Sequence, residues 1–307
     1  MIQVAVIVPA LNEERTVAMT VGSIVSTMGD RVQTEVIVVD HGSTDKTVTR
    51  AQGAGASIVH APQAPTIGAL RNLGVAASSG DLLVFLDADV TVSPRWAERV
   101  VELAASIEAN DRIITGNICR IPDDAGWIER SWFGNRRGRP THLGSGHLLI
   151  PRSFFMAIGG FDEILATGED YDICQRAVRN GGEVRIDPQL DAVHHGFPRT
   201  LGQFFRREIW HGVSDARSLR HWSHSKIAIA ATAFATLHVG AGFAFLSGHG
   251  SGAIAALTAA ASIAVSLAAW KFGPRVRQAP GKILLLSYAY LTARALSVVH
   301  AGRRVRS

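Results

Sequence analysis

The sequence has few cysteines, and its last third has no acidic residues. Its 307 residues include two cysteines, Cys119 and Cys174, far apart and without a CxxC pair or a nearby cluster of metal ligands. This excludes a disulfide framework and a zinc module, and it favours a reducing, cytosolic environment for the first part of the chain. The N-terminus also lacks a basic segment followed by a small-residue cleavage site, so we expect no secretory signal.

Acidic side chains are missing from the C-terminal region. Residues 1–215 carry 20 basic and 26 acidic side chains, whereas residues 216–307 carry 11 basic side chains and no acidic one. The formal charge of +5 therefore does not describe a basic surface spread over the molecule, and we expect no nucleic acid partner. A basic region with long apolar stretches instead favours a membrane with anionic headgroups as its partner.

The first 90 residues alternate between short apolar runs and segments of helical length. The runs are rich in Val, Ile and Leu, which is typical of strands buried on both faces of a parallel sheet. The predicted strands cover residues 2–8, 35–39, 57–60 and 82–86, and the predicted helices cover residues 12–28, 44–53 and 66–79. Residues 43–45 are predicted to cap the second helix. The alternation predicts an α/β fold with a doubly wound, mostly parallel sheet.

Polar or tightly turning residues follow three of these strands, at residues 9–13, 40–43 and 87–89. Ligands of doubly wound sheets bind at the carboxyl ends of the strands, so we expect these residues to form one site. Asp87 and Asp89 would place two carboxylates at this edge, and such hard oxygen ligands suit Mg²⁺ or Mn²⁺. Asp pairs are also common in turns for structural reasons, so the pair gains weight only from its neighbours.

The second half of the α/β part has a looser pattern. Residues 112–195 contain shorter predicted strands, glycine-rich turns and a helix over residues 169–180, and we expect them to shape a second pocket. The next segment, residues 200–212, places several apolar side chains near one helical face. They are Leu201, Phe204, Phe205, Ile209 and Trp210. This helix is predicted either to lie at a bilayer surface or to close the soluble core.

Two uncharged apolar stretches follow, residues 227–247 and 252–270. At 1.5 Å per residue each reaches roughly 28–32 Å, enough to cross the hydrocarbon core. They predict a transmembrane hairpin, with a buried pair of soluble helices as the alternative. A third stretch, residues 283–300, is predicted either to span the membrane or to lie in its interface. We therefore divide the chain into an α/β domain, residues 1–222, and a membrane region, residues 223–307.

Basic residues flank the predicted hairpin, whereas the connection between its helices is uncharged. Those before it are Arg217, Arg220 and Lys226, and those after it are Lys271, Arg275, Arg277 and Lys282. By the positive-inside bias, the α/β domain and the loop at 271–282 face the cytoplasm. The prediction is a multi-pass protein of the cell (inner) membrane with its α/β domain in the cytoplasm.

Six short blocks between residues 8 and 172 form a specific set. They read VPALNE from residue 8, VVDHGSTD from 38, ALRNLG from 69, FLDAD from 85, GGFDE from 159 and GEDYD from 168. With these blocks the chain resembles family 2 glycosyltransferases of the GT-A fold. No GxGxxG opens a helix after the first strand and no GxxxxGK[ST] occurs, which argues against dinucleotide-binding and P-loop proteins.

The resemblance implies a site for a sugar nucleotide. In similar enzymes the nucleoside is held by the residues that match Pro9, Ala10, Asn12, Glu13 and Asp40. The flanking residues would be Gly68 and Arg71, and the residues that meet ribose and, through a divalent metal, the diphosphate would be Asp87, Ala88 and Asp89. From its residue type alone, the Arg71 guanidinium suits a diphosphate or a carboxylate such as Asp40, with an ordinary surface ion pair as the alternative.

The resemblance also implies a metal and a general base. Asp89 would be the direct ligand of Mn²⁺ or Mg²⁺, beside Asp87. In some similar enzymes a histidine at the position of His194 or His195 completes the metal shell or touches the diphosphate, and a polar pair at a strand end is the alternative. Asp170 matches the base, and Glu169 either orients it or takes its role. One base opposite the leaving group predicts a single displacement with inversion.

Two departures from the family pattern narrow the prediction. His41 stands where the family often has an acidic or amide residue, which puts the nucleoside contacts in doubt. Residues 203–207, QFFRR, echo the Gln-x-x-Arg-Trp element of processive polysaccharide synthases, but Arg207 replaces the tryptophan. With two or three apolar helices, this favours transfer of a single sugar. The resemblance implies a UDP-sugar as the first donor and a GDP-sugar as the second, because UDP is the family's commonest carrier. The apolar C-terminal region favours a lipid-linked acceptor.

Two other classes of function stay open. A non-catalytic membrane scaffold could keep the sugar-nucleotide fold without turnover, and His41 is the feature that favours it. A nucleotidyltransferase would show a glycine-rich, basic phosphate loop after the first strand, and residues 9–14 do not form one.

Overall fold

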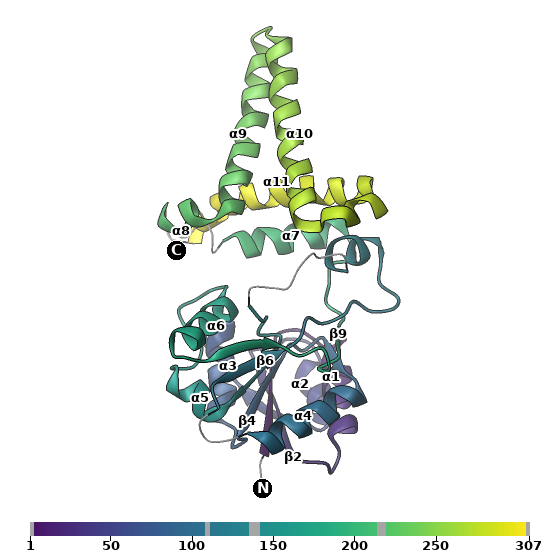
Figure 1. The fold of residues 1–307 in the computed structure, drawn as a ribbon, viewed down its shortest axis with the longest axis vertical. Coiled ribbons are helices and arrows are strands. Elements are labelled where there is room, and N and C mark those ends of the chain that lie inside the picture. The colour runs from purple at the N-terminus through teal and green to yellow at the C-terminus, as the bar shows by residue number, and fades with distance from the viewer. Residues whose placement is uncertain (1–2, 108–110, 135–141, 214–218, 305–307) are drawn as a thin grey trace. The chain divides into compact units, whose positions relative to one another are not determined.

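A computed structural model of the protein describes residues 3–107, 111–134, 142–213 and 219–304. The chain folds into two compact units (Figure 1). Unit 1 consists of residues 1–122 and 140–196, and unit 2 consists of residues 123–139 and 197–307. The segment 123–139 thus interrupts unit 1 and belongs to unit 2. This division by compactness does not test the predicted extent of the catalytic part, residues 1–222, which stays a prediction.

Unit 1 is built on a seven-stranded, mostly parallel sheet with the order β3-β2-β1-β4-β7-β6-β8. Its strands are β1 (Gln3–Ala10), β2 (Gln33–Asp40), β3 (Ser57–His60), β4 (Leu82–Leu86), β6 (Ile113–Gly116), β7 (His147–Pro151) and β8 (Glu183–Ile186). Strand β7 runs antiparallel to both of its neighbours, and the other pairings are parallel. A second, two-stranded sheet pairs β5 (Val90–Val92) with β9 (Ala192–His194). The predicted doubly wound, mostly parallel α/β fold is confirmed.

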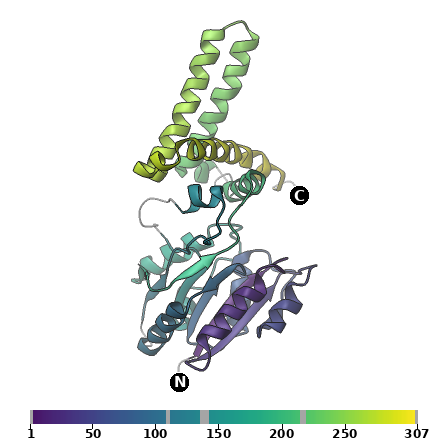
Figure 2. The same cartoon turned by 90° about the vertical axis from the view of Figure 1, so that its right-hand side faces the viewer.

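Helices cover both faces of this sheet (Figures 1 and 2). They are α1 (Val17–Met28), α2 (Thr47–Gly53), α3 (Ile67–Ala76), α4 (Pro94–Ser106), α5 (Arg152–Ala157) and α6 (Glu169–Arg179). Within β1, Val4 and Val6 belong to the core shared with α1 and α4, whereas Ala5 and Ile7 belong to the core shared with α3, α5 and α6. Successive side chains of a strand point to opposite faces, so burial on both faces requires the unbroken apolar run that the sequence shows.

The first two helices begin later than predicted. Helix α1 begins at Val17 instead of residue 12, and α2 begins at Thr47 instead of residue 44. Lys46 is the N-cap and its side chain makes no capping bond, but Asp45, one of the residues expected to cap this helix, accepts a hydrogen bond of 2.9 Å from the N–H of Thr47. The Ser43 hydroxyl accepts a hydrogen bond from the Asn12 N–H instead, at 2.9 Å. The polar residues after β1 and β2 therefore bind the two loops to each other.

Unit 2 contains a helical hairpin. Its elements are η1 (Glu129–Phe133), α7 (Leu201–Gly212), α8 (Leu219–His224), α9 (Lys226–Leu246), α10 (Gly250–Phe272), η2 (Gly273–Gln278) and α11 (Pro280–Arg304). Helices α9 and α10 lie side by side along their length, and α11 lies across the base of this pair, next to α7 (Figures 1 and 2). A capping box of Thr200 and Gln203 begins α7.

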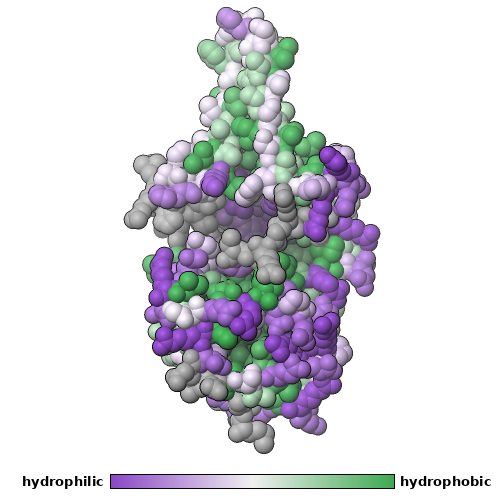
Figure 3. Space-filling model, in the orientation of Figure 1, coloured by the Kyte–Doolittle hydropathy of each residue, from purple (hydrophilic) through white to green (hydrophobic). Residues whose placement is uncertain are grey.

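Two described helical segments are long and apolar enough to cross a membrane. They are residues 226–246, with a mean hydropathy of 1.7, and residues 250–278, with a mean hydropathy of 1.9. Figure 3 shows mostly hydrophobic and near-neutral residues over the visible face of the α9–α10 hairpin. Phe243, Leu246 and Ile254 are among its exposed large side chains. Among the described helices, α11 does not meet the same criterion of length and hydropathy.

The buried side of α7 differs from the predicted apolar face. Leu201 and Trp210 are exposed, and the buried residues are Phe204, Glu208 and Gly212. Helix α11 packs against this side, where a Cβ on Gly212 would overlap the Ser297 hydroxyl. The buried Glu208 carboxylate forms ion pairs of 2.8 Å with Arg207 and 3.1 Å with Arg294.

An aromatic cluster forms the core of unit 2 around Trp132, which is fully buried. Its ring lies 5.1–5.2 Å from the rings of Phe204, Phe272 and Tyr290. The Lys271 ammonium lies 4.0 Å from the centre of the Trp132 ring, a cation–π contact. The segment 123–139 is thus held in unit 2 by apolar packing.

Candidate active site

The strand register of unit 1 brings the predicted loops to one edge of the sheet. Ala10, the last residue of β1, pairs with Asp40, the last residue of β2. Asp40 in turn pairs with His60 at the end of β3. Asp87 follows the end of β4, the other neighbour of β1. The predicted clustering of strand ends is therefore present, and Pro9, Ala10, Asp40 and Asp87 all lie along this edge.

The loops after β1 and β2 are locked together through Asn12. Its φ of 57° lies in the left-handed region, which asparagine tolerates better than most residues. The Asn12 side-chain oxygen accepts a hydrogen bond of 2.9 Å from the Thr44 N–H. The next residue, Glu13, donates its N–H to the Thr47 hydroxyl at 2.7 Å. The exposed Asn12 is thus held in one conformation at the sheet edge.

Asp40 is buried and is engaged by its own turn. Its carboxylate accepts hydrogen bonds from the N–H groups of Gly42, at 3.1 Å, and Ser43, at 3.2 Å. His60 approaches the same carboxylate, with 3.6 Å between Nδ1 and Oδ2. His41, the departure from the family pattern, directs its Nε2 to the Ala64 carbonyl at 2.9 Å. The carboxylate therefore shapes the turn, whatever else it binds.

Three side chains form a group that could hold a metal ion. Ligand atoms of Asp87, Asp89 and His194 all lie within 4.8 Å of one another. The β5–β9 pairing produces this arrangement, because it places His194 opposite Val90, next to Asp89. The other predicted histidine, His195, lies outside this group among the described residues, and its Nε2 is 2.9 Å from the Thr91 hydroxyl.

Two glycines leave room for the two carboxylates. A Cβ added to Gly146 would overlap the Asp87 carboxylate, and a Cβ added to Gly196 would overlap the Asp89 carboxylate. Gly146 stands just before β7, and its carbonyl accepts the Asp87 N–H at 3.2 Å. Close approach of this kind requires glycine. Neither glycine belongs to the sequence blocks that predicted the site.

The charge at this edge fits a divalent cation. Asp87 and Asp89 raise the pKa of Glu13, although burial of Glu13 raises it more. Three carboxylates close enough to interact leave an excess of negative charge that a metal neutralises. Carboxylate oxygens with one imidazole are a donor set that Mn²⁺ or Mg²⁺ accepts. The residues present therefore fit the metal that the sequence predicts.

Arg71 connects the two halves of the site. It lies on α3 and is 1% exposed, and its guanidinium donates a 2.9 Å hydrogen bond to Asp87 and another of 2.9 Å to Glu169. Among the described residues its ion pairs are with Asp87 and with Glu169 at the N-terminus of α6, and not with Asp40, the partner suggested by the sequence. The Phe161 ring lies 5.6 Å from the guanidinium. A buried cation shared by two carboxylates fixes the distance between them.

Glu169 and Asp170 have different surroundings. The Glu169 carboxylate is buried and accepts hydrogen bonds from Arg71 and, at 2.8 Å, from the Ser145 hydroxyl. Asp170 is partly exposed, and burial followed by the nearby Glu169 raises its pKa. The His142 ring lies 3.8 Å from Asp170 and opposes this shift. A carboxylate with a raised pKa and access to solvent is suited to proton transfer.

Gly68 and Ala88 lie beside the site in packing positions. Ala88 is 4% exposed and belongs to the core, and its carbonyl accepts a hydrogen bond from the Thr20 hydroxyl. A Cβ on Gly68 would lie 3.1 Å from the Asp162 carbonyl and 3.3 Å from the Phe161 Cβ. The sequence did not single out Ser145, His142, Gly146 or Gly196, although the run of residues 144–147, Gly-Ser-Gly-His, has the small residues that a close approach needs.

Comparison with known proteins agrees with this geometry. The profile of Glycosyl transferase family 2 matches residues 5–161, about half of the chain. The pre-mycofactocin glycosyltransferase of Mycobacterium tuberculosis is 28% identical over 204 residues, which are 61% of this chain and 43% of that protein. The glucosyl-3-phosphoglycerate synthase of Mycolicibacterium smegmatis is 42% identical over 94 residues, which are 28% of this chain and 31% of that protein. The chain therefore spans less than half the length of these relatives.

Solved structures share the fold over more of the chain. A mannosyltransferase from Pyrobaculum calidifontis, solved with GDP-Man and Mn²⁺, covers 96% of this chain and 86% of its own, with a TM-score of 0.59 and 20% identity. GalNAc-T7, solved with UDP, GalNAc and Mn²⁺, covers 73% of this chain and 52% of its own, with a TM-score of 0.52 and 17% identity. The fold is that of these proteins, and by the match over residues 5–161 the chain belongs to glycosyltransferase family 2.

Proposed function

We propose that the protein transfers a single sugar from a nucleotide-diphosphate sugar to an acceptor hydroxyl or phosphate, with inversion at the anomeric carbon. The observation that carries the proposal is the Arg71 bridge. It joins Asp87 of the possible metal group to Glu169, which immediately precedes Asp170. One site thus holds two carboxylates that could bind a metal with the diphosphate, Asp87 and Asp89, and one carboxylate that could accept a proton, Asp170.

The Asp87, Asp89 and His194 side chains would hold Mn²⁺ or Mg²⁺. The bound ion supplies Lewis-acid stabilisation for the negative charge that grows on the diphosphate as it leaves. Arg71 keeps Asp87 in place by its 2.9 Å hydrogen bond and lowers the excess of negative charge near the phosphate oxygens. Asn12, Glu13 and Asp40 would hold the nucleoside, since they border the same sheet edge.

We assign the general base to Asp170. During transfer the acceptor oxygen bonds to the anomeric carbon, the bond from that carbon to the diphosphate breaks, and the acceptor proton moves to the Asp170 carboxylate. Glu169 is less suited to this role because Arg71 and Ser145 already occupy it. Its negative charge instead helps to raise the Asp170 pKa. With one base opposite the leaving group, a single displacement inverts the configuration.

The acceptor in this proposal is lipid-linked, and the protein lies in the cell (inner) membrane with unit 1 in the cytoplasm. Support comes from the two apolar helices, because most of their residues are exposed instead of packed in a core. Exposed apolar surface on this scale indicates contact with another apolar phase. The residues on either side of the hairpin are basic, whereas its tip, residues 247–251, is uncharged. This distribution favours an orientation with the basic flanks in the cytoplasm.

The donor in this proposal is a UDP-sugar, with a GDP-sugar as the second candidate. Structures with the same fold hold UDP in one case and GDP-Man in another. The experiment measures nucleoside diphosphate release by the full-length protein in detergent, with UDP- and GDP-sugars, a membrane lipid extract, and Mn²⁺, Mg²⁺ or EDTA. We expect release from one donor that EDTA abolishes and that Asp89→Asn reduces at least 100-fold.

A second pair of variants tests the base. Asp170→Asn is expected to lower kcat by 100-fold or more with little change in donor binding, because the amide cannot accept the proton. Asp172→Asn, on the same helix and paired with Arg176, is the matched control and should stay within about twofold of the original activity. Full activity of Asp170→Asn would refute the assignment. Failure to bind any donor with any metal would instead favour a non-catalytic scaffold.

A further inference from the structure

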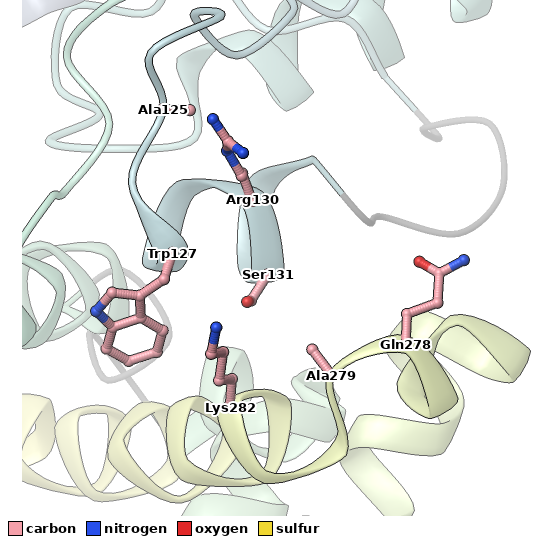
Figure 4. A pocket seen from close by; sticks show the side chains of 7 residues that line it. All are labelled: Ala125, Trp127, Arg130, Ser131, Gln278, Ala279 and Lys282. Atoms are coloured by element: carbon pink, nitrogen blue, oxygen red, sulfur yellow. The ribbon is translucent and has the colours of Figure 1, made fainter.

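Unit 2 contains a cavity of about 500 Å³ that is lined by none of the residues of the candidate active site. Its walls come from η1 with the segment just before it, and from the end of η2 with the start of α11 (Figure 4). The lining residues are Ala125, Trp127, Arg130, Ser131, Gln278, Ala279 and Lys282. A cavity of this volume lies within the range of natural ligand sites.

The lining has the chemistry of an anion site. It includes two cations, Arg130 and Lys282, one hydroxyl, one amide and no carboxylate. Figure 4 shows the Lys282 side chain pointing toward Ser131 and the Trp127 ring. Lys282 makes no ion pair with any residue in the described part of the chain, and its ammonium can therefore engage an added anion. Ammonium, guanidinium and hydroxyl groups together are typical partners of phosphate oxygens.

The charge of the whole unit strengthens this preference. Residues 123–139 and 197–307 contain 18 basic and 5 acidic residues, whereas the residues of unit 1 contain 13 basic and 21 acidic ones. Arg275 and Arg277 lie in η2, next to the cavity wall formed by Gln278. A concave site in a strongly positive unit concentrates anions.

The place of the cavity along the chain indicates where the anion comes from. Helix η2 directly follows α10, the second of the two apolar helices, and Lys282 stands in the first turn of α11. If α9 and α10 cross a membrane, as proposed above, this turn lies at the depth of the lipid headgroups. Trp127, a half-buried aromatic residue in the wall, is of the type enriched at that depth.

We propose that this cavity binds the phosphate headgroup of a membrane lipid. The phosphate would be bound by the Lys282 ammonium and the Ser131 hydroxyl beside the Trp127 ring, and Arg130, which points away from Lys282 on the other side of η1, would add positive charge to the site. The lipid tail would leave toward the apolar hairpin. Such a site is separate from the donor site and would hold a lipid whether or not sugar transfer takes place. Its failure would leave the proposed transferase activity unaffected.

The test measures lipid binding by the purified full-length protein in a nonionic detergent, by native mass spectrometry. The probes are phosphatidylglycerol, farnesyl phosphate, phosphatidylcholine and inorganic phosphate. We expect one molecule of phosphatidylglycerol or farnesyl phosphate to bind at least tenfold more tightly than phosphatidylcholine, and the tighter of these two identifies the headgroup as a diester or a monoester. If inorganic phosphate at the same concentration displaces the bound lipid, the site binds free phosphate and the proposal of a lipid headgroup is wrong.

Variants locate the site. Lys282→Glu should weaken binding of the preferred lipid at least tenfold, and Lys282→Gln should do so less strongly, since it removes the charge without reversing it. Arg206→Glu makes the same charge reversal in α7, outside the cavity lining, and should change binding less than twofold. Equal losses in Lys282→Glu and Arg206→Glu would refute the cavity in favour of general surface charge. Unchanged thermal unfolding of Lys282→Gln guards against a loss caused by misfolding.

Discussion

Two small residues determine where the acidic side chains of the site can lie. We predict that Gly196→Ala abolishes high-affinity Mn²⁺ binding, because its Cβ would overlap the Asp89 carboxylate and displace it from Asp87 and His194. Manganese binding can be measured by electron paramagnetic resonance of the free ion. Gly22→Ala, in α1 with no atom within 4 Å of the added Cβ, is the control and should leave binding unchanged. Wild-type affinity in Gly196→Ala would contradict the assigned site.

A buried histidine makes the stability of unit 1 depend on pH. Burial lowers the pKa of His147 to about 4, and the neutral ring accepts a hydrogen bond of 2.9 Å from the Trp96 indole. In the unfolded chain the histidine pKa is near 6.5. Between pH 6.5 and pH 4 the unfolded chain therefore binds a proton at His147 that the folded protein does not bind. The free energy of unfolding falls as the pH drops below 6.5 for this reason. The loss is about 2 kcal/mol at pH 5 and about 3 kcal/mol at pH 4.

The measurement is the thermal unfolding midpoint at pH 7 and pH 5. The drop should be larger for the wild-type protein than for His147→Gln, whose side chain can still accept the Trp96 hydrogen bond but does not titrate. Parallel pH dependence in both proteins would show that other groups cause the loss.

The sequence predicted which residues belong to the site better than it predicted which side chains they contact. The blocks in the sequence pointed to Arg71, Glu169 and Asp170, but nothing in the sequence showed that Arg71 would join Asp87 to Glu169, 98 positions away from Arg71. The contact depends on α3 and α6 contributing to the same apolar core, which is a property of the folded chain.

At the scale of elements, the loop after β1 should be sensitive to its backbone conformation. We predict that donor affinity falls in the order wild type, Asn12→Gly, Asn12→Ala. Glycine keeps the φ of 57° but loses the acceptor for the Thr44 N–H, worth about 1 kcal/mol or a fivefold change. Alanine also pays the cost of the left-handed conformation, a further 1–2 kcal/mol or so. Isothermal titration with the donor gives the order, and equal affinities for both variants would exclude a role of backbone strain.

The sequence predicted the strands of the first half because their run of apolar residues is unbroken. It did not give the position of β7, which lies between β4 and β6 and runs antiparallel to both. The outer strands β6 and β8 have four residues each and pair across about 70 positions, Ile113 with Glu183 at one end. Short strands with distant partners carry little local signal, because side-chain packing and not local propensity selects them.

At the scale of the whole molecule, the segment 123–139 determines which pieces of the chain can be separated. A protein that ends at residue 196 keeps this segment but loses the helices that cover Ile128, Trp132 and Phe133. We predict that it aggregates. Replacing residues 123–139 by a Gly-Ser linker in the same truncated chain should restore a monomer, measured by size-exclusion chromatography. A soluble monomer without the replacement would show that the segment can pack elsewhere.

The charge pattern of the sequence pointed to the second unit but not to its full extent. The sequence placed the basic region after residue 215, and the fold adds residues 123–139 with four more arginines to it. That addition could not be predicted from charge, because the segment also carries three acidic residues, Asp123, Asp124 and Glu129. Its assignment depends on the packing of Trp132 with α7, α10 and α11.

The discontinuity of unit 2 also sets an order on biosynthesis. Trp132 leaves the ribosome long before Tyr290, the partner that covers one side of its ring, is made. At about 5–20 residues per second, the intervening stretch of chain takes on the order of ten seconds to synthesise. During that interval the nascent chain presents an uncovered aromatic segment between two halves of a sheet that can already pair. Chaperones therefore meet this protein while a segment in its middle, and not at its end, still lacks its packing partner.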